Sequence, residues 1–270
     1  MRMKFSICLV ILICLLFTAQ AFAEERNELT NDVILSMTAD DYATCYRILL
    51  NCKKSQVNLS NDELDEIATE FYIATYKGRQ GSLQVTSWYD NLLMNETGIN
   101  SDELALAKMY PSDLAAVYTA SSIANTETTS RYNKGLYLGN ADAFRHAAWS
   151  ALLVCRFYAL GKGNFAWCSS RANEWTTAHE TGATVDSSLS SSQRAADHEM
   201  DILNNAAGRA AAETTYTSES LALSKVQNYV DNGFCKRIMT NAQMNANYGY
   251  ADMKNVSSWT LKATNTVGKC

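Results

Sequence analysis

The chain has 270 residues, 47% of them hydrophobic, and its 28 acidic residues outnumber 23 basic ones for a net charge of −5. This acidic balance weighs against a nucleic-acid partner, because phosphate backbones are usually met by clusters of Lys and Arg. Pro111 is the only proline in the sequence. So low a proline content favours a helical protein, since proline is tolerated mainly at helix starts.

The first 23 residues have the pattern of a secretory signal peptide. Arg2 and Lys4 form a basic start, residues 5–17 are an almost unbroken apolar run, and residues 21–23 supply a small-x-small cleavage site. No later stretch approaches the roughly 18 apolar residues of a membrane helix. We therefore expect a secreted or periplasmic protein without a transmembrane segment. Its residues 24–270 would form a single domain with a net charge of −7.

Six cysteines follow the predicted signal peptide, and an even number in an exported chain favours disulfides. A thiolate metal site is the weaker interpretation because the chain has no Cys-x-x-Cys pair. The spacing favours Cys155 with Cys168, at the ends of two successive helices, and Cys235 with Cys270. Cys45 and Cys52 could pair only if the helix between them breaks, since seven helical residues span roughly 10 Å. The expected fold is an all-α, compact multi-helix domain stapled by disulfides.

Apolar residues at helical spacing predict a series of helices in the first half of the chain. They cover residues 40–50, 61–78, 101–109 and a segment that begins at Pro111, with a further turn or two at 87–94. Capping patterns begin at Asn61 and Ser101. A glycine-containing loop, residues 132–139, then leads into residues 140–209, which hold all three histidines of the chain.

The first motif helix is predicted from residue 140 to about residue 160. Asp142, His146 and Trp149 are spaced i, i+4, i+7 and therefore share one face of this helix. Asp142 can orient the His146 ring and fix its tautomer, as a carboxylate does for a metal ligand or a base. Arg145 lies beside this face and could bind a phosphate or carboxylate, or pair with an acidic neighbour. Taken alone, His146 is better interpreted as a hydrogen-bonded buried histidine than as a ligand or base.

The second motif helix is predicted from about residue 166 to residue 181. Trp175 and His179 are spaced i, i+4, and Glu180 follows directly. Ala183 stands where a His-Glu-x-x-His metalloprotease would have its second histidine, so that interpretation fails. His179 and Glu180 diverge by about 100° on a helix, and only one of them can point squarely into a site.

The third motif helix is predicted from about residue 191 to residue 214. Asp201, Asn205 and Arg209 fall on one stripe, with Gly208 beside it. Asn and Gly are poor residues for a helix interior, which indicates buried partners for the amides and a close helix contact at the glycine. His198 could be a further ligand, but the run Asp-His-Glu also suits a solvated first turn.

Together these residues resemble a known but uncharacterised bacterial domain. The motifs are Asp142-Ala-Phe-Arg-His-Ala-x-Trp149, Ala178-His-Glu180 and Met200-Asp-x-x-Asn-Asn-x-x-Gly-Arg209. That domain occurs in secreted proteins and at the ends of wall-associated and Rhs-type polymorphic toxins. The resemblance covers about a quarter of the chain and includes neither His198 nor the cysteines. It implies a site and an antagonistic context, with a toxin and a cognate immunity protein, but no reaction.

The first functional hypothesis is a secreted hydrolase that acts on an envelope substrate such as a phospholipid phosphoester. In its metal-dependent version, Zn²⁺ or another divalent ion that activates water is held by His146, His179 and Asp201. The catalytic candidates are Glu180, Asn205, Arg145 and Arg209, with Asn205 orienting the substrate and an arginine stabilising an anionic transition state.

Two alternatives remain open at this point. In a metal-free enzyme, Glu180 would act as general acid/base with Asp201 as its partner and cleave the glycan of peptidoglycan. In a non-catalytic secreted protein, the same His, Asp and Asn side chains would form a buried hydrogen-bond network that fixes helix packing.

Overall fold

The computed structural model describes residues 29–55, 59–80, 99–182 and 186–270. The predicted signal peptide and the predicted turn at residues 87–94 lie outside these ranges. The described elements are, in chain order, α2 (Asn31–Leu35), α3 (Ala39–Lys54), α4 (Asn61–Gln80), α6 (Ser101–Met109), α7 (Pro111–Arg131), α8 (Asn140–Ala159), α9 (Phe165–Gly182), α10 (Ser191–Ala212), α11 (Glu219–Asp231), β1 (Lys236–Arg237), α12 (Asn241–Asn245), α13 (Tyr250–Lys254) and β2 (Lys262–Ala263).

The described part of the chain is therefore all-α apart from one short strand pair, as the sequence predicts. None of its helices has the combination of length and apolarity that a membrane crossing requires.

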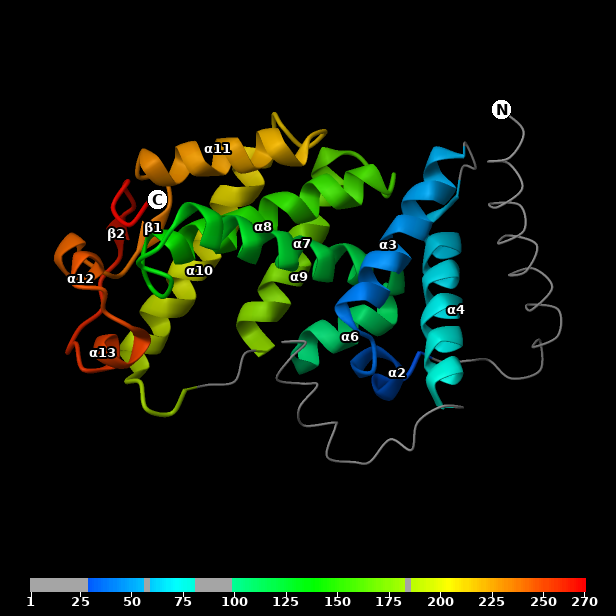
Figure 1. The fold of residues 1–270 in the computed structure, drawn as a ribbon, viewed down its shortest axis with the longest axis horizontal. Coiled ribbons are helices and arrows are strands. Elements are labelled where there is room, and N and C mark those ends of the chain that lie inside the picture. Colours follow the sequence, from blue (N-terminus) through cyan, green and yellow to red (C-terminus); the bar gives the residue numbers. More distant parts are fainter. Residues whose placement is uncertain (1–28, 56–58, 81–98, 183–185) are drawn as a thin grey trace.

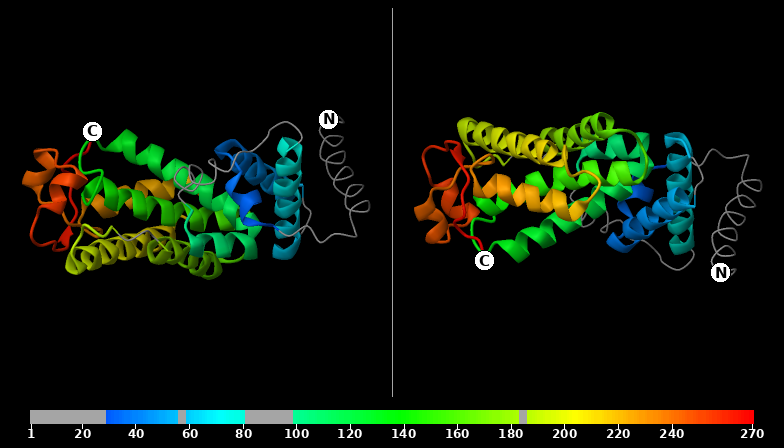
Figure 2. Two further views of the ribbon diagram at one scale, coloured as in Figure 1. Left: turned by 90° about the horizontal axis from the view of Figure 1, so that it is seen from below. Right: turned by 90° about the horizontal axis from the view of Figure 1, so that it is seen from above.

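Helix α8 forms the centre of the molecule, with α7, α9, α10 and α11 packed around it (Figure 1). Seventeen of its 20 residues are buried, so it has no solvent face along most of its length. Figure 2 shows α9 and α10 along one side of the elongated molecule and α7 along the opposite side. A helix that is enclosed in this way must carry its polar side chains, the motif residues among them, into the interior.

Helices α8 and α10 approach closely where Gly208 faces Ala147. A Cβ atom at Gly208 would overlap the carbonyl group of Ala147. The predicted close contact is thus present, and glycine is the residue that permits it. The contact holds the polar stripes of the two helices against each other.

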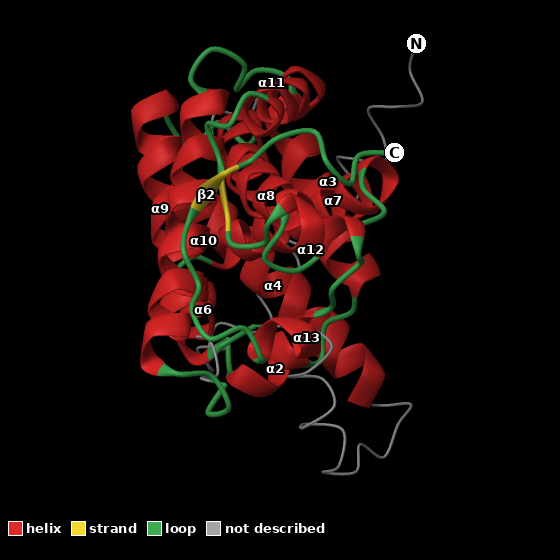
Figure 3. Cartoon of the chain, turned by 90° about the vertical axis from the view of Figure 1, so that its left-hand side faces the viewer, coloured by secondary structure: helices red, strands yellow, loops and turns green. Residues whose placement is uncertain are grey.

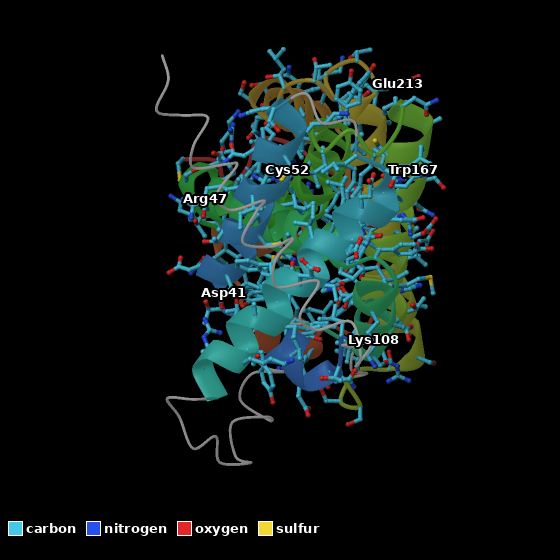
Figure 4. All side chains as sticks on the ribbon, turned by 90° about the vertical axis from the view of Figure 1, so that its right-hand side faces the viewer. Asp41, Arg47, Cys52, Lys108, Trp167 and Glu213 are labelled. Atoms are coloured by element: carbon cyan, nitrogen blue, oxygen red, sulfur yellow. The ribbon has the colours of Figure 1, made fainter. Side chains whose placement is uncertain are left out.

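The end of the molecule opposite the C-terminus is a layer of α2, α3 and α4, of which α3 and α4 pack against α7. Inside it, the Tyr42 ring stacks on Tyr118 with centroids 4.5 Å apart and meets Tyr72 edge-on at 5.8 Å. Figure 4 views this end from outside, with Asp41, Arg47 and Cys52 along α3.

The other end carries β1, β2, α12 and α13, which surround a second, smaller core built largely from methionines (Figure 3). β1 and β2 pair antiparallel, with Lys236 opposite Ala263. Asn204 joins this end to α10, because its amide donates to the Lys236 carbonyl at 2.9 Å and its Oδ1 accepts from the Lys236 N–H at 2.8 Å. This confirms the buried partner predicted for an Asn in a helix interior.

Two predicted helix starts are confirmed at residues 61 and 101, but the capping residue of each lies one position earlier than predicted. The cap of α6 is Asn100, whose side chain accepts from the N–H groups of Asp102 and Glu103, rather than Ser101. At α4, the Ser60 N–H donates to Glu63 Oε2 at 2.7 Å, so the capping interaction precedes Asn61. In both cases the glutamate at the third helical position accepts a hydrogen bond from the N–H of the capping residue.

The predicted disulfides are not formed among the described cysteines. The thiols of Cys45, Cys155, Cys168, Cys235 and Cys270 are free, and all but the last are buried. Helix α3 is continuous, so Cys45 and Cys52 lie on one unbroken helix. Burial raises the pKa of the Cys155 and Cys168 thiols to about 12, which makes them unreactive core residues. Helix α8, enclosed by its neighbours, gives the fold a large apolar core, so the fold does not depend on disulfides for its stability.

Candidate functional site

Five polar side chains from three helices meet inside the bundle and form what we call the acidic cluster: Asp142 and His146 of α8, Glu180 of α9, and Asp201 and Asn205 of α10. His146 lies at its centre, with Nε2 3.3 Å from Asp201 Oδ1 and 3.7 Å from Asp142 Oδ1. Its Nδ1 lies 3.4 Å from Glu180 Oε1, which also accepts a hydrogen bond from the Asn205 amide at 3.0 Å.

Helical spacing accounts for the pairs within this cluster. Asp142 with His146, and Asp201 with Asn205, are each four residues apart and therefore share a face. Asp142 is also held from outside its helix, because its Oδ2 accepts from the Leu138 N–H at 2.7 Å. Leu138 has φ 58°, a left-handed conformation that costs a non-glycine residue of the order of 1 kcal/mol or more. This bond holds the loop in place and aims the carboxylate.

Arg145 makes the closest contacts to the cluster. Its Nη2 lies 2.6 Å from Asp142 Oδ1 and 2.6 Å from His146 Nε2, so one guanidinium nitrogen donates toward both atoms. The arginine side chain is 35% exposed, whereas the histidine is 4% exposed. Burial and the adjacent arginine charge lower the pKa of His146. The imidazole is therefore neutral, with Nε2 as the acceptor.

The cluster and its surroundings carry more negative than positive charge. Asp197, one turn before Asp201, brings the number of carboxylates to four, against the single guanidinium of Arg145. Burial, followed by the charges of Asp142 and Glu180, raises the pKa of Asp197 to about 7. The same causes raise the pKa of Asp201 well above its usual range. The arrangement favours either protons or an additional cation.

Three buried atoms of the cluster have no hydrogen-bond partner among the described residues: Asp201 Oδ1, Asn205 Oδ1 and His146 Nδ1. Buried polar atoms are nearly always paired in folded proteins, and exceptions call for an explanation such as an ion, a ligand or a catalytic role. Two of the three atoms are oxygens with lone pairs available.

Asp142, His146 and Asp201 could hold a metal ion. Each offers one ligand atom, and these atoms lie within 4.8 Å of one another. Two carboxylate oxygens and one neutral imidazole nitrogen suit zinc and other divalent first-row metals. The partnerless Asp201 Oδ1 and the surplus of negative charge both fit such an ion.

His179, which the sequence places with His146 and Asp201, lies apart from these ligand atoms. Its Nδ1 lies 3.0 Å from Glu103 Oε1 on α6, and its ring meets Trp149 edge-on with centroids 5.0 Å apart. Burial by itself would lower the pKa of His179, but the hydrogen bond and charge of Glu103 outweigh it and raise the pKa. Helix α9 thus turns Glu180 toward the acidic cluster and His179 away from it, in keeping with their divergence of about 100°.

Glu103 is the residue of the site that sequence reasoning missed. It occupies the third position of α6, where a capping box accounts for it fully, and its Oε2 does accept from the Asn100 N–H at 2.9 Å. Its burial at 4% exposure is the signal of a second role, because a capping glutamate is normally solvated. That burial follows from the packing of α6 against α9.

A cavity of about 500 Å³ adjoins the cluster between α6, α7, α8 and α9. Arg145, Trp149 and His179 line one side of it, and Ser121, Ser122 and Asn125 of α7 contribute polar groups on another. Trp149 is 7% exposed and its Nε1 has no hydrogen-bond partner among the described residues. The cavity is thus lined by several hydrogen-bond donors and by apolar side chains.

Two further predicted residues lie outside the acidic cluster. Arg209 lies two turns beyond Asp201 on α10 and donates to the hydroxyl groups of Ser150 and Thr176, each at 3.4 Å. Burial lowers the pKa of this arginine. His198 is exposed, but it is the eighth residue of α10 and does not lie in the first turn of that helix.

No curated protein and no solved structure matches this chain. Residues 104–234, from α6 to just beyond α11, match the family described as a domain of unknown function (DUF6973), in agreement with the expected resemblance to an uncharacterised domain.

Proposed function

We propose that this protein is an exported, divalent-metal-dependent hydrolase that acts on a phosphoester in an envelope substrate such as a phospholipid. One observation carries the proposal. The acidic cluster is buried, has a surplus of negative charge, and leaves Asp201 Oδ1, 3.3 Å from His146 Nε2, without a hydrogen-bond donor among the described residues. A bound divalent cation would satisfy that oxygen and compensate the charge.

A purely structural network is the main competitor, and the unpaired atoms argue against it. Buried polar networks stabilise a fold when every member is paired, and a partly paired network costs more than an apolar core. Here Asn205 Oδ1 and Asp201 Oδ1 are both unpaired among the described residues. Such a cost is typical of sites that are kept for function.

Asp142, His146 and Asp201 would hold the metal. When bound, such an ion would lower the pKa of a water molecule and stabilise the negative charge that develops in the reaction. Glu180 lies beside His146, and its carboxylate is fixed by Asn205, so it is placed to accept a proton from water. His179, fixed by Glu103, lines the adjacent cavity and is placed to donate a proton to a leaving group. Arg145 lines the same cavity and suits an anionic group of the substrate.

Glycan cleavage by Glu180 is less well supported by the electrostatics. A glycosidase needs one carboxyl group that stays protonated near neutral pH. Burial by itself would raise the pKa of Glu180, but contacts with His146 and with the Asn205 amide outweigh it and lower the pKa. Glu180 is therefore better suited to act as a base. The toxin context and a cognate immunity protein rest on the motif resemblance alone and remain part of the proposal.

Metal binding by the purified protein tests the proposal directly. We expect Zn²⁺ or Mn²⁺ to bind with a stoichiometry of one in calorimetry, and the loaded protein to hydrolyse bis(p-nitrophenyl) phosphate or phospholipid vesicles. The variant Asp201→Asn should lose both properties, whereas Asp62→Asn, on the first turn of α4, should keep both.

A folded wild-type protein that binds neither metal would contradict the metal-dependent version. If folded variants with His146→Ala and Glu180→Ala keep full activity, the acidic cluster is not the active site. If those substitutions abolish folding without any activity in the wild type, the cluster is structural.

A further inference from the structure

Arg145 belongs to both parts of the site. It contacts two members of the acidic cluster, and it also lines the cavity between α6, α7, α8 and α9. Its side chain is 35% exposed, so it already extends toward that space. The guanidinium can therefore occupy either of two positions, one in the acidic cluster and one in the cavity. Its position decides whether the cavity presents a positive charge to a ligand.

The guanidinium and a metal ion cannot share the cluster. Nη2 lies 2.6 Å from both Asp142 Oδ1 and His146 Nε2, atoms of two of the three candidate ligand residues. A zinc-sized ion bonded to these atoms would lie about 2.0–2.2 Å from each, in the space that Nη2 fills. A bound cation must therefore displace the arginine, and the adjacent cavity is where its exposed part already lies.

A displaced guanidinium would find a single carboxylate in the described lining of the cavity, and that carboxylate already accepts a hydrogen bond on each oxygen. Glu103 is the only carboxylate among the described residues that line it. Both of its oxygens are in use, Oε1 by His179 Nδ1 and Oε2 by the Asn100 N–H. A half-buried arginine without a counter-ion is costly, so the displaced side chain would favour an anionic ligand.

The other polar groups around the cavity suit the same ligand. The ring of His179 offers a donor to the cavity when protonated, and beside it lies Trp149, whose buried indole N–H has no described partner. Leu114, Val117 and Trp175 add apolar surface to the lining. A lining that combines donors with apolar side chains matches a phosphate group attached to an apolar or aromatic remainder.

We propose that this cavity binds the phosphate group of the ligand and that Arg145 is its specificity-determining residue, released to the anion when a cation takes its place between Asp142 and His146. The proposal rests on the function proposed above and adds the place where the phosphate group binds, the residue that selects it and the order of events. Because binding is reciprocal, phosphate should then strengthen cation binding by the same factor by which the cation strengthens phosphate binding.

Mn²⁺ binding, followed through the electron paramagnetic resonance signal of the free ion with and without inorganic phosphate, tests this coupling. We expect phosphate to raise the Mn²⁺ affinity of the wild type about tenfold or more, within the usual range of coupling between sites. Arg145→Met should bind Mn²⁺ more tightly than the wild type without phosphate, and phosphate should no longer raise that affinity. Arg131→Met removes an arginine that pairs with Glu127 on the surface of α7, and it should behave as the wild type.

Phosphate could also bind the metal directly without any help from Arg145. In that case the coupling would persist in Arg145→Met, and the proposal would be overturned. It would also be overturned if phosphate left the Mn²⁺ affinity of the wild type unchanged. Short-chain phosphatidic acid, used as a soluble probe, separates two sources of the phosphate group. If it binds more tightly than inorganic phosphate, the apolar residues of the cavity bind the lipid part of the ligand. If the two bind equally, the site recognises the phosphate group alone.

If the wild type binds no divalent cation, the proposed function is refuted. Phosphate binding in the cavity can still be tested by a second experiment that needs no metal. Asp142→Asn removes the charge that holds Arg145 and should free the guanidinium without any metal. We expect calorimetry to show phosphate binding by this variant at several times the wild-type affinity. Absence of phosphate binding by folded Asp142→Asn would overturn the pocket itself.

Discussion

Glu103 binds with both carboxylate oxygens, one to the N-terminus of α6 and one to the imidazole of His179. The bond to Nδ1 sets the histidine tautomer and leaves Nε2 for the cavity, as carboxylates do for catalytic and metal-bound histidines. The side chain of Asn100 strengthens the arrangement, because its amide donates to the carbonyl groups of Ala178 and His179 at 3.0 and 2.9 Å.

Glu103→Gln should lower the pKa of His179. The glutamine can still accept the Asn100 N–H, but it removes the charge and presents an amide to Nδ1, which shifts the proton to Nε2. The wild-type pKa is raised above 6.5, so its stabilisation is complete below pH 6.5 and is lost as the pH rises through the higher folded value. Imidazole titration by NMR measures the shift, and thermal melts across that window should show a weaker pH dependence in the variant.

The control for this substitution is Glu63→Gln, which changes a capping glutamate of α4 that is bonded to Ser60 and contacts no histidine in the described structure. It should leave the His179 titration unchanged. An unaltered His179 pKa in Glu103→Gln would show that the carboxylate does not control the ring.

Spacing along one helix predicted the pairs Asp142/His146 and Asp201/Asn205 at the residue scale, because i, i+4 geometry is local. The choice between His179 and Glu180 was not local. It depends on the rotation of α9 about its axis, which is set by packing against α6 and α8. Neither the spacing nor the residue types of His179 and Glu180 indicate how α9 is rotated about its axis.

At the scale of elements, the crossing of α8 and α10 depends on Gly208. Gly208→Ala gains up to about 1 kcal/mol of helix propensity. It also forces a methyl group into the backbone carbonyl of Ala147, which cannot rotate away. Overpacking of this kind costs about 1–3 kcal/mol or more, so we expect a net loss of stability in urea unfolding and a weakened acidic cluster.

Gly78→Ala is the matched control, because it lies near the end of α4 and a Cβ there would meet nothing within 4 Å. It should be neutral or stabilising by up to about 1 kcal/mol. If both variants had the same stability as the wild type, the close contact of α8 and α10 would be refuted.

A second connection between elements is the buried ion pair of Lys162 and Asp113, with Nζ and Oδ1 2.6 Å apart and both side chains at most 2% exposed. It links the loop before α9 to the start of α7. Arg171 and Trp175 of α9 also contact Asp113 Oδ2, at 3.4 and 3.2 Å. The aspartate therefore holds three segments of the chain together.

Lys162→Met should destabilise the protein by about 3 kcal/mol, the lower end for breaking a buried pair, because Arg171 still compensates part of the Asp113 charge. Adding Asp113→Asn should recover part of the loss, since no buried charge then remains unpaired. Urea unfolding measures both, with Lys108→Met on the exposed face of α6 as the reference. Equal stability of Lys162→Met and the reference would show that the pair contributes nothing.

At the scale of the whole molecule, the acidic cluster should link stability to cation binding. Four carboxylates face one guanidinium in the metal-free protein, and Asp201 Oδ1 is unpaired. Asp201→Asn removes one of these carboxyl groups and should stabilise the metal-free protein by about 1 kcal/mol or more, which raises its melting temperature. A cation at 100 times its dissociation constant should stabilise the wild type by about 2.7 kcal/mol and the variant by much less.

Thermal melts of both proteins, with chelator and with Mn²⁺, measure this difference, and Asp62→Asn supplies the reference for the loss of one charge. A wild-type melting temperature that does not respond to any divalent cation would contradict the linkage. The same melts would then favour a cluster that serves only helix packing.

The sequence by itself determined the helical class, the limits of the motif helices to within a residue or two, and the stripes of polar residues on each, because apolar periodicity, caps and i, i+4 spacing are local properties. Tertiary structure alone decided that Asp142 rather than His179 lies with His146 and Asp201, that Glu103 holds His179, and that Cys45, Cys155, Cys168 and Cys235 are buried free thiols. These outcomes depend on helix rotation and on contacts between segments far apart in the chain. They are set by how the side chains of α6, α8, α9 and α10 pack, and no single helix encodes that packing.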